Sequence, residues 1–107
     1  MKSGLLIGWT TVDSESTALS LARAMIEQRL AVCVQVDAGV QSFYRWKGEV
    51  NSDREWRLTV KFLETDRDSL SAFIRSNHPY DVPEWVVVQA DQVAPDYLKW
   101  AMGLNEK

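Results

Sequence analysis

Apolar and polar residues along the first third of the chain predict a buried strand followed by a helix. Residues 5–11 form a short apolar run that ends in hydroxyls, which is typical of a buried strand. Asp13 or Ser14 can then cap a helix, in which apolar residues recur at helical spacing. These positions are Ala18, Leu21, Ala22, Met25, Ile26 and Leu30. We therefore expect an amphipathic helix of about four turns.

A period of two then predicts a long hairpin. Valines alternate with polar residues over 32–37, Gly39 interrupts the pattern as a bulge or bend, and extended character resumes over 40–46. Gly48 suits the positive-φ position of a hairpin turn. The return arm places Trp56, Leu58, Val60 and Phe62 on one face and Arg57, Thr59 and Lys61 on the other. The pattern indicates two paired arms of unusual length.

The remaining chain predicts a helix, a strand and a closing helix. Thr65, Asp66 and Asp68 suit a helix N-terminus, and apolar residues follow at helical spacing until Pro79 forbids further helix. Residues 85–88 read as an apolar strand, and Pro95 can open the last helix.

The order of these elements predicts one ferredoxin-like α+β domain over residues 1–107, βαββαβ with an added C-terminal helix. Both longer helices should cover one sheet face. The second face belongs to a sheet with long arms, in a chain that carries 5 Trp, 3 Tyr and 3 Phe. Exposed strand edges and apolar surface promote aggregation, so we expect identical subunits to cover them in a closed homo-oligomer.

Charge and composition narrow the choice of partners. The net charge of −3 indicates no basic face, which argues against nucleic acid and anionic membranes as partners. The apolar run at the N-terminus is too short for a signal peptide, so we expect a cytoplasmic protein. The single cysteine, Cys33, cannot form an internal disulfide or a structural zinc site by itself.

His78, the only histidine, stands in the densest group of functional side chains, Asn77-His78-Pro79-Tyr80-Asp81-Val82-Pro83-Glu84. Two alternatives are equally supported: the imidazole satisfies the end of the preceding helix, or it binds a ligand. With Asp81 and Glu84 nearby, imidazole and carboxylate would suit Cu(II) or Zn(II).

Three other positions have a structural and a functional interpretation. Cys33 lies in a predicted strand, where a buried hydrophobic role is favoured over a ligand role. Ser42, Tyr44 and Trp46 share one face of the arm, where a packing ladder is favoured. Lys61 is either exposed or buried against a carboxylate such as Glu55 or Glu84, and burial there would mark a polar pocket. No catalytic constellation can be assembled, so we expect no enzyme.

Together these segments resemble the CutA divalent-cation tolerance family. The resemblance covers nearly the whole chain and rests on motifs in matching order: Thr10-Thr11-Val12, Ala22-Arg23, Arg29-Leu30-Ala31-Val32-Cys33-Val34, Ser42-Phe43-Tyr44-Arg45-Trp46-Lys47-Gly48, Glu55, Lys61, His78-Pro79-Tyr80-Asp81-Val82-Pro83-Glu84 and Tyr97-Leu98-Lys99-Trp100. It implies a ferredoxin-like homotrimer whose arms extend sheets across subunits. It also implies a role in tolerance of copper and other divalent metals.

Carried over by position, the resemblance implies that Cys33 and His78 are metal ligands, with Glu84 as a third candidate. Lys61, Tyr44 and Tyr80 would shape a pocket between subunits. Two departures stand out. No cysteine accompanies Gly8 to Thr11, which weakens a Cu(I) site, and Phe62 replaces the threonine usual after the lysine.

Three functions compete at this point. The first is a trimeric protein of copper tolerance that binds Cu(II), or less favourably Zn(II). The second is a signalling or scaffold trimer, similar in architecture to the PII proteins, with a small ligand or partner protein in clefts between subunits. The third, an enzyme with His78 as general acid or base, has the least support because the sequence offers no substrate.

Overall fold

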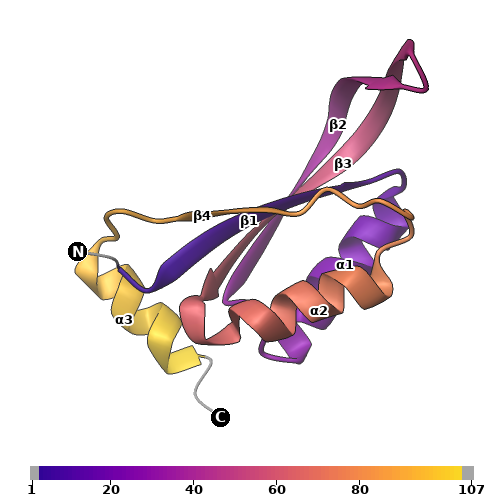
Figure 1. Cartoon of the computed structure of the whole chain (residues 1–107). Helices are drawn as coiled ribbons and strands as arrows, with labels where there is room; N and C mark the ends of the chain where they lie inside the picture. Colours follow the sequence, from indigo (N-terminus) through magenta and orange to yellow (C-terminus); the bar gives the residue numbers. More distant parts are fainter. Residues whose placement is uncertain (1–2, 105–107) are drawn as a thin grey trace.

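The computed structural model describes residues 3–104, and its elements follow the predicted order (Figure 1). They are β1 (Leu5–Val12), α1 (Glu15–Glu27), β2 (Cys33–Trp46), β3 (Glu49–Leu63), a 3-10 turn η1 (Glu64–Asp66), α2 (Arg67–Asn77), β4 (Val86–Gln89) and α3 (Pro95–Leu104). The strands form one antiparallel sheet in the order β2-β3-β1-β4. This α+β arrangement confirms the predicted fold class, the βαββαβ order with an added helix.

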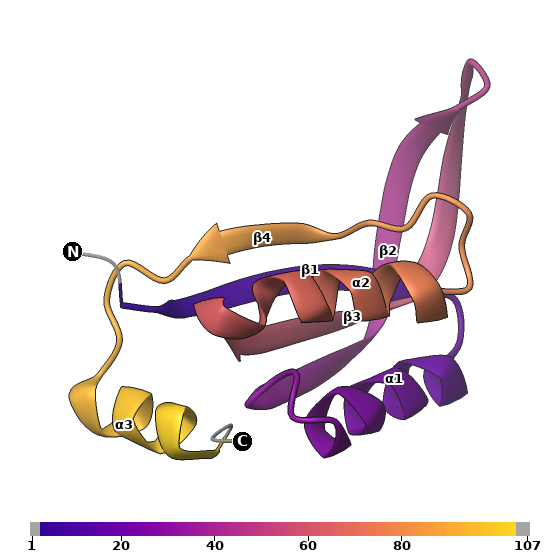
Figure 2. The ribbon, with the colours of Figure 1, turned by 60° about the horizontal axis from the view of Figure 1, so that its bottom comes forward.

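Helices α1 and α2 cover one face of the sheet with the main core between (Figure 2). Ser14 caps α1, because its hydroxyl accepts a hydrogen bond from the Thr17 N–H at 3.2 Å. The predicted alternation on β3 is confirmed, since every second side chain points into this core. The buried members of the core are Leu6, Val12, Ala18, Leu21, Met25, Leu30, Ala31, Leu58, Val60, Phe62, Leu70 and Ile74.

The alternate side chains of the same strands form the opposite face, which we call the open face. It includes Ile7, Trp9, Thr11, Cys33, Gln35, Asp37, Arg57, Thr59, Lys61, Val86 and Val88. Helix α3 borders this face at the end where β1 begins, and Ala101 packs there with Leu5 and Leu63 in a second, smaller core. Neither α1 nor α2 covers the open face.

The β2–β3 hairpin continues beyond the body as an arm, residues 40–55 (Figure 1). Its tip is a two-residue turn in which Lys47 and Gly48 have φ of 51° and 81°. The predicted irregularity at Gly39 is confirmed, because the pairing shifts register between Asp37 and Val40 and Gly39 has φ of 74°. A Cβ there would also lie 3.1 Å from the Arg54 guanidinium. Aromatic side chains of the arm are exposed, Phe43 by 72%.

The structure corrects several predicted boundaries. Helix α1 ends at Glu27, and Leu30 reaches the core from the following turn. The second helix is preceded by η1, so Thr65 lies outside α2. Trp85 precedes β4, and its ring stacks on Phe62 with centroids 5.9 Å apart. The Trp85 side chain packs against the core although its backbone is not paired in the sheet, so its apolar character alone did not mark the start of the strand.

Candidate functional site

The His78 imidazole bonds to the end of strand β1. Its Nε2 lies 2.9 Å from Thr10 Oγ1 and 3.0 Å from the Thr11 carbonyl oxygen. Its Nδ1 accepts a hydrogen bond from the Tyr80 N–H at 3.1 Å. Because a backbone N–H can only donate, this network assigns the proton to Nε2. Both ring nitrogens are therefore occupied by partners within the chain.

The first of the two predicted roles of His78 is wrong, because its imidazole does not complete the preceding helix. The ligand role stays a prediction. The helix end is completed by the backbone, since the His78 N–H donates to the Ile74 carbonyl at 3.0 Å. Burial lowers the pKa of His78, opposed by the hydrogen bond to Thr11 and by the charge of Glu55. The imidazole is neutral at pH 7, and a metal would have to displace one of its hydrogen bonds.

Tyr80 links the His78 loop to β3. Its hydroxyl donates to the Glu55 carboxylate at 2.7 Å, and its ring meets the His78 ring edge-on at 4.9 Å. Burial, followed by the hydrogen bond to Glu55, raises the pKa of Tyr80. Glu55 is only 8% exposed. The sequence had offered Glu55 as a partner of Lys61, but the structure pairs it with a phenol instead.

Two further predicted residues lie around this cluster. Glu84 is exposed, and partial desolvation followed by the charge of Glu55 raises its pKa. Tyr44 lies farther along the arm, where its hydroxyl donates to the Asp53 carboxylate. This hydrogen bond is the main cause of a raised pKa of Tyr44. Tyr80 and Tyr44 thus contact different carboxylates, Glu55 and Asp53. A pocket between subunits that both tyrosines border stays a prediction.

Lys61 and Cys33 lie together near α3. They are directly paired between β2 and β3, and both are partly buried. The Lys61 ammonium lies 5.9 Å from the Tyr97 ring centroid. Burial raises the pKa of Tyr97, and the neighbouring Cys33 side chain raises it further. This group combines an ammonium, a phenol and a thiol.

The candidate metal ligands are separated within one chain. Cys33 is in register with Lys61, whereas the His78 ring bonds to Thr11, which is in register with Arg57. Four residues of strand separate these rows by about 13 Å. Within residues 3–104 no group of three or more His, Cys, Asp or Glu side chains could hold a metal ion. Cys33 and His78 therefore do not share an ion within the isolated chain.

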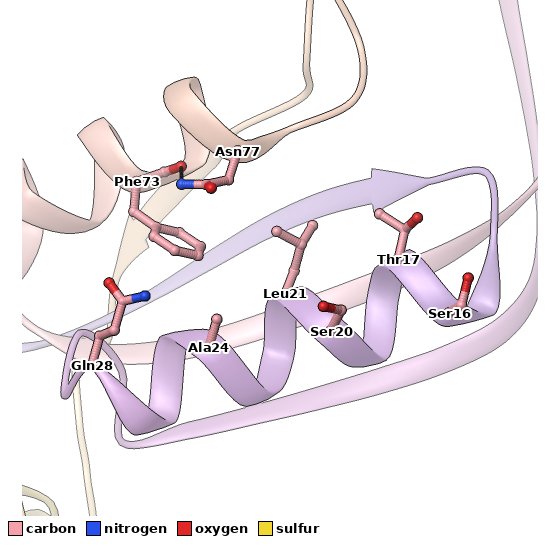
Figure 3. A pocket seen from close by; sticks show the side chains of 8 residues that line it. All are labelled: Ser16, Thr17, Ser20, Leu21, Ala24, Gln28, Phe73 and Asn77. Carbon is pink, nitrogen blue, oxygen red and sulfur yellow. Dashed lines mark hydrogen bonds between the residues drawn. The ribbon is translucent and has the colours of Figure 1, made fainter.

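A hollow on the outer surface lies between α1 and α2 (Figure 3). It holds about 600 Å³ and is lined by Ser16, Thr17, Ser20, Leu21, Ala24, Gln28, Phe73 and Asn77. The Asn77 amide already donates to the Phe73 carbonyl at 2.9 Å. This hollow has no imidazole, thiol or carboxylate, the side chains that bind Cu(II) or Zn(II). The groups around His78 and around Lys61 therefore remain the stronger candidates. Over the same described part of the chain, no helix is long and apolar enough to span a membrane.

The sheet order, the covered face and the long arm define a class of small α+β proteins, and comparison with known proteins identifies the family. A model of the CutA1 divalent ion tolerance protein family matches residues 6–103. This chain belongs to that family. The resemblance that the sequence motifs indicated is confirmed.

Named relatives span bacteria and animals. The chain is 41% identical over 90 residues to the divalent-cation tolerance protein CutA of Thermus thermophilus, a match that covers 84% of this chain and 87% of the relative. It is 36% identical to protein CutA of Mus musculus, covering 92% of this chain and 55% of the relative. The chain thus spans little more than half the length of the mouse protein. For the Xenopus laevis homologue the share is 66%.

Solved structures agree with the fold. The Thermus thermophilus divalent cation tolerance protein superposes with a TM-score of 0.87 at 38% identity, covering 91% of this chain and 94% of that one. CutA from Synechococcus elongatus gives 0.93 at 31% identity, covering 99% and 95%. The whole body and arm of this chain therefore follow the family architecture.

Proposed function

We propose that this protein acts as a cytoplasmic homotrimer in tolerance of divalent cations, copper foremost. The observation that carries this proposal is the family match over residues 6–103, supported by a relative at 41% identity that is named a divalent-cation tolerance protein. The His78 ring carries its proton on Nε2, the nitrogen that contacts the Thr10 hydroxyl, and so does not act as a base toward it. We therefore propose a binding or response role without catalysis.

The uncovered surfaces support the trimer. Val86 and Val88 on the open face are 52% and 42% exposed, and the arm exposes Phe43, Trp46 and Val50. Among residues 3–104, β3 is the only strand that pairs with β2, so the other edge of β2 is free along the arm. Apolar side chains and an unpaired strand edge together favour coverage by identical subunits.

The trimer also bears on how metal would bind. We propose that direct Cu(II) binding, or less favourably Zn(II), uses His78, Cys33 and Glu84 from more than one subunit. The separation of Cys33 from His78 along the sheet supports this requirement. Binding at His78 would cost the hydrogen bonds that its ring makes within the chain, so we expect exchangeable rather than structural binding.

Calorimetry on chelator-stripped protein tests the proposal, with sedimentation reporting its assembly. Cu(II) should bind saturably to a trimer, with affinity reduced at least about tenfold in His78→Ala and in Cys33→Ala. Zn(II) should bind more weakly. Thr10→Val is the matched control, since it removes a partner of the ring and retains the imidazole. Binding unchanged in both ligand variants would reject these residues as ligands, and a monomer would reject the trimer.

A second candidate function is a PII-like trimer that binds a small ligand between subunits. The position of Lys61 supports this second function. Its ammonium lies against Tyr97 on the face of the sheet that neither α1 nor α2 covers. In this proposal Lys61, Tyr44 and Tyr80 border a pocket between subunits. Metal tolerance would then be an indirect outcome of ligand binding.

A further inference from the structure

The hollow between α1 and α2 opens on the side of these helices that faces away from the sheet. Ser16, Ser20 and Gln28 at its rim are exposed, whereas Leu21 at its floor is buried. The open face lies on the opposite side of the sheet, and the arm extends beyond the body (Figures 1 and 2). None of the residues that line the hollow belongs to the surfaces that the proposed trimer covers, so that assembly does not require the hollow to be filled.

The lining of the hollow is polar but carries no charge. Ser16, Thr17 and Ser20 supply hydroxyls from α1, and Gln28 and Asn77 supply amides. Hydroxyls and amides can each donate and accept hydrogen bonds. Within residues 3–104, the side chains of Ser20 and Gln28 have no hydrogen-bond partner. The amide nitrogen of Asn77 is engaged within α2, which leaves its carbonyl oxygen as an acceptor.

Phe73 adds a flat apolar surface to this polar lining. Its side chain points from α2 toward α1 and is partly buried against the main core (Figure 3). Leu21 and Ala24 complete the apolar part of the lining. The face of an aromatic ring carries negative partial charge, which attracts C–H groups that neighbouring oxygen atoms polarise. One hollow thus combines an aromatic ring with neutral hydrogen-bonding groups.

The charges in and around the hollow favour a neutral ligand. No Lys, Arg, Asp or Glu lines it, so neither an anion nor a cation would find an opposite charge there. The N-terminus of α1 attracts anions in general, but Glu15 in the first turn opposes that attraction. A purely apolar ligand would displace water from the hydroxyls and amides without replacing its hydrogen bonds. A volume of about 600 Å³ lies in the range of small-molecule sites.

We propose that this hollow binds a small neutral polyhydroxyl compound, a monosaccharide or a cyclitol. One C–H face of the ligand lies on the Phe73 ring, and its hydroxyls bond to the side chains of Ser20, Gln28 and Asn77. This site goes beyond the proposed function, since it uses neither the candidate metal ligands nor the surfaces between subunits. Because the hollow is open and its contacts are few, we expect a Kd on the order of 1–10 mM.

A titration of the intact, isotope-labelled protein followed by NMR tests the proposal. The probes are glucose, galactose, mannose, N-acetylglucosamine and myo-inositol, each added to about 50 mM, where a site with a Kd of 10 mM is mostly occupied. We expect at least one probe to shift the backbone amides of α1 and α2 saturably. The tighter of the sugars and myo-inositol identifies the ligand class. No saturable shift with any probe, or shifts confined to other elements, would overturn the proposal.

Matched compounds test the chemistry of the contact. Cyclohexanol keeps the ring of myo-inositol with one hydroxyl, and tetrahydropyran-2-methanol does the same for the hexoses. Either should bind at least about tenfold more weakly than its polyhydroxyl parent. Glucose 6-phosphate should bind no more tightly than glucose, because no cation lines the hollow. Equal affinity for parent and analogue, or tenfold tighter binding of the phosphate, would contradict a neutral polyhydroxyl ligand.

Paired variants locate the site. Ser20→Leu removes a hydroxyl and fills the hollow, so it should weaken the best probe at least about tenfold. Ser76→Leu makes the same change on exposed α2 outside the lining and should leave the affinity unchanged. Phe73→Leu should weaken binding at least about threefold, and Trp100→Leu removes an exposed ring on α3 as its control.

Thermal melting of each variant shows that it is folded, and Ser20→Leu carries the test if Phe73→Leu is not. Unchanged affinity in Ser20→Leu, or an equal loss in Ser76→Leu, would contradict the proposed site. Sedimentation and the Cu(II) titration report on other residues. A failure of the sugar titration therefore leaves the trimer and the metal proposal to their own measurements.

Discussion

The two faces of the sheet come from the same strands, but one face is buried and the other is largely exposed. On the face beneath α1 and α2, Leu58, Val60 and Phe62 are fully buried at 0% exposure. On the open face, Val86 remains 52% exposed, and on the arm Phe43 is 72% exposed. Successive side chains on one strand therefore point alternately into the packed core and onto the exposed open face.

This difference separates what the chain completes alone from what it leaves to other molecules. The covered face gains its packing from helices that are close in sequence. Helix α3 covers only one end of the open face, and no element of the described chain covers the rest of this face or the arm. The covered face thus accounts for the fold of one subunit, and the uncovered surface is where assembly must be sought.

The largest expected effect comes from making the same substitution on both surfaces. Phe62→Ala should lower the free energy of unfolding by about 3–5 kcal/mol, because it removes a buried ring that stacks on Trp85. Phe43→Ala is the matched comparison: the Phe43 ring is 72% exposed within one chain, so any loss beyond about 1 kcal/mol measures burial of the arm by another subunit. Urea unfolding measures both. A loss in Phe43→Ala as large as that in Phe62→Ala would show that the arm is as well covered in the native protein as the core, by another subunit.

A smaller effect measures how tightly the covered face is packed. At Gly8 a Cβ would lie 2.5 Å from the Trp85 ring, so Gly8→Ala should cost about 1–3 kcal/mol through overpacking. Adding Trp85→Phe should recover part of that loss, since the smaller ring leaves room for the methyl group. The control is Gly103→Ala, where a Cβ meets nothing within 4 Å. If Gly8→Ala and Gly103→Ala cost the same, the close packing of Trp85 against β1 is refuted.

Periodicity in the sequence predicted the fold because it reports contacts that regular backbone imposes. The alternation over 56–62 identified the buried face, and Gly39 located the irregularity between Asp37 and Val40. The turn at Gly48 was also predicted from its need for positive φ. Each of these signals is local, since a strand or turn is specified by residues only a few positions apart.

The candidate sites were harder to predict because their contacts join distant segments. His78 bonds to Thr10 across 68 positions, and Tyr80 bonds to Glu55 across 25. No periodic pattern connects such residues. Lys61 shows the same limit, because its neighbour Tyr97 comes from α3 and not from the carboxylates that the sequence suggested. Motif density marked the His78 segment as important, but it did not show which atoms its ring would contact.

The smallest expected effect lies at His78, which joins the end of β1 to the loop after α2. Burial lowers the pKa of His78 in the folded protein, so near its unfolded value of about 6.5 the unfolded chain binds more protons. Stability should therefore fall as the pH drops below about 6.5. Because the ring is partly exposed and solvent weakens the effect, we expect less than about 1 kcal/mol.

The measurement is the change in unfolding free energy between pH 7.5 and 5.0, for the unaltered protein and for His78→Gln. The variant keeps a polar side chain but cannot titrate, so it should lose stability less steeply over this range. The raised pKa of Glu84 acts in the opposite direction, because the folded protein then retains more protons than the unfolded chain, but both proteins share it. Identical slopes would show that His78 titrates as it does in an unfolded chain. Burial of the ring beside the end of β1 would then not hold it neutral.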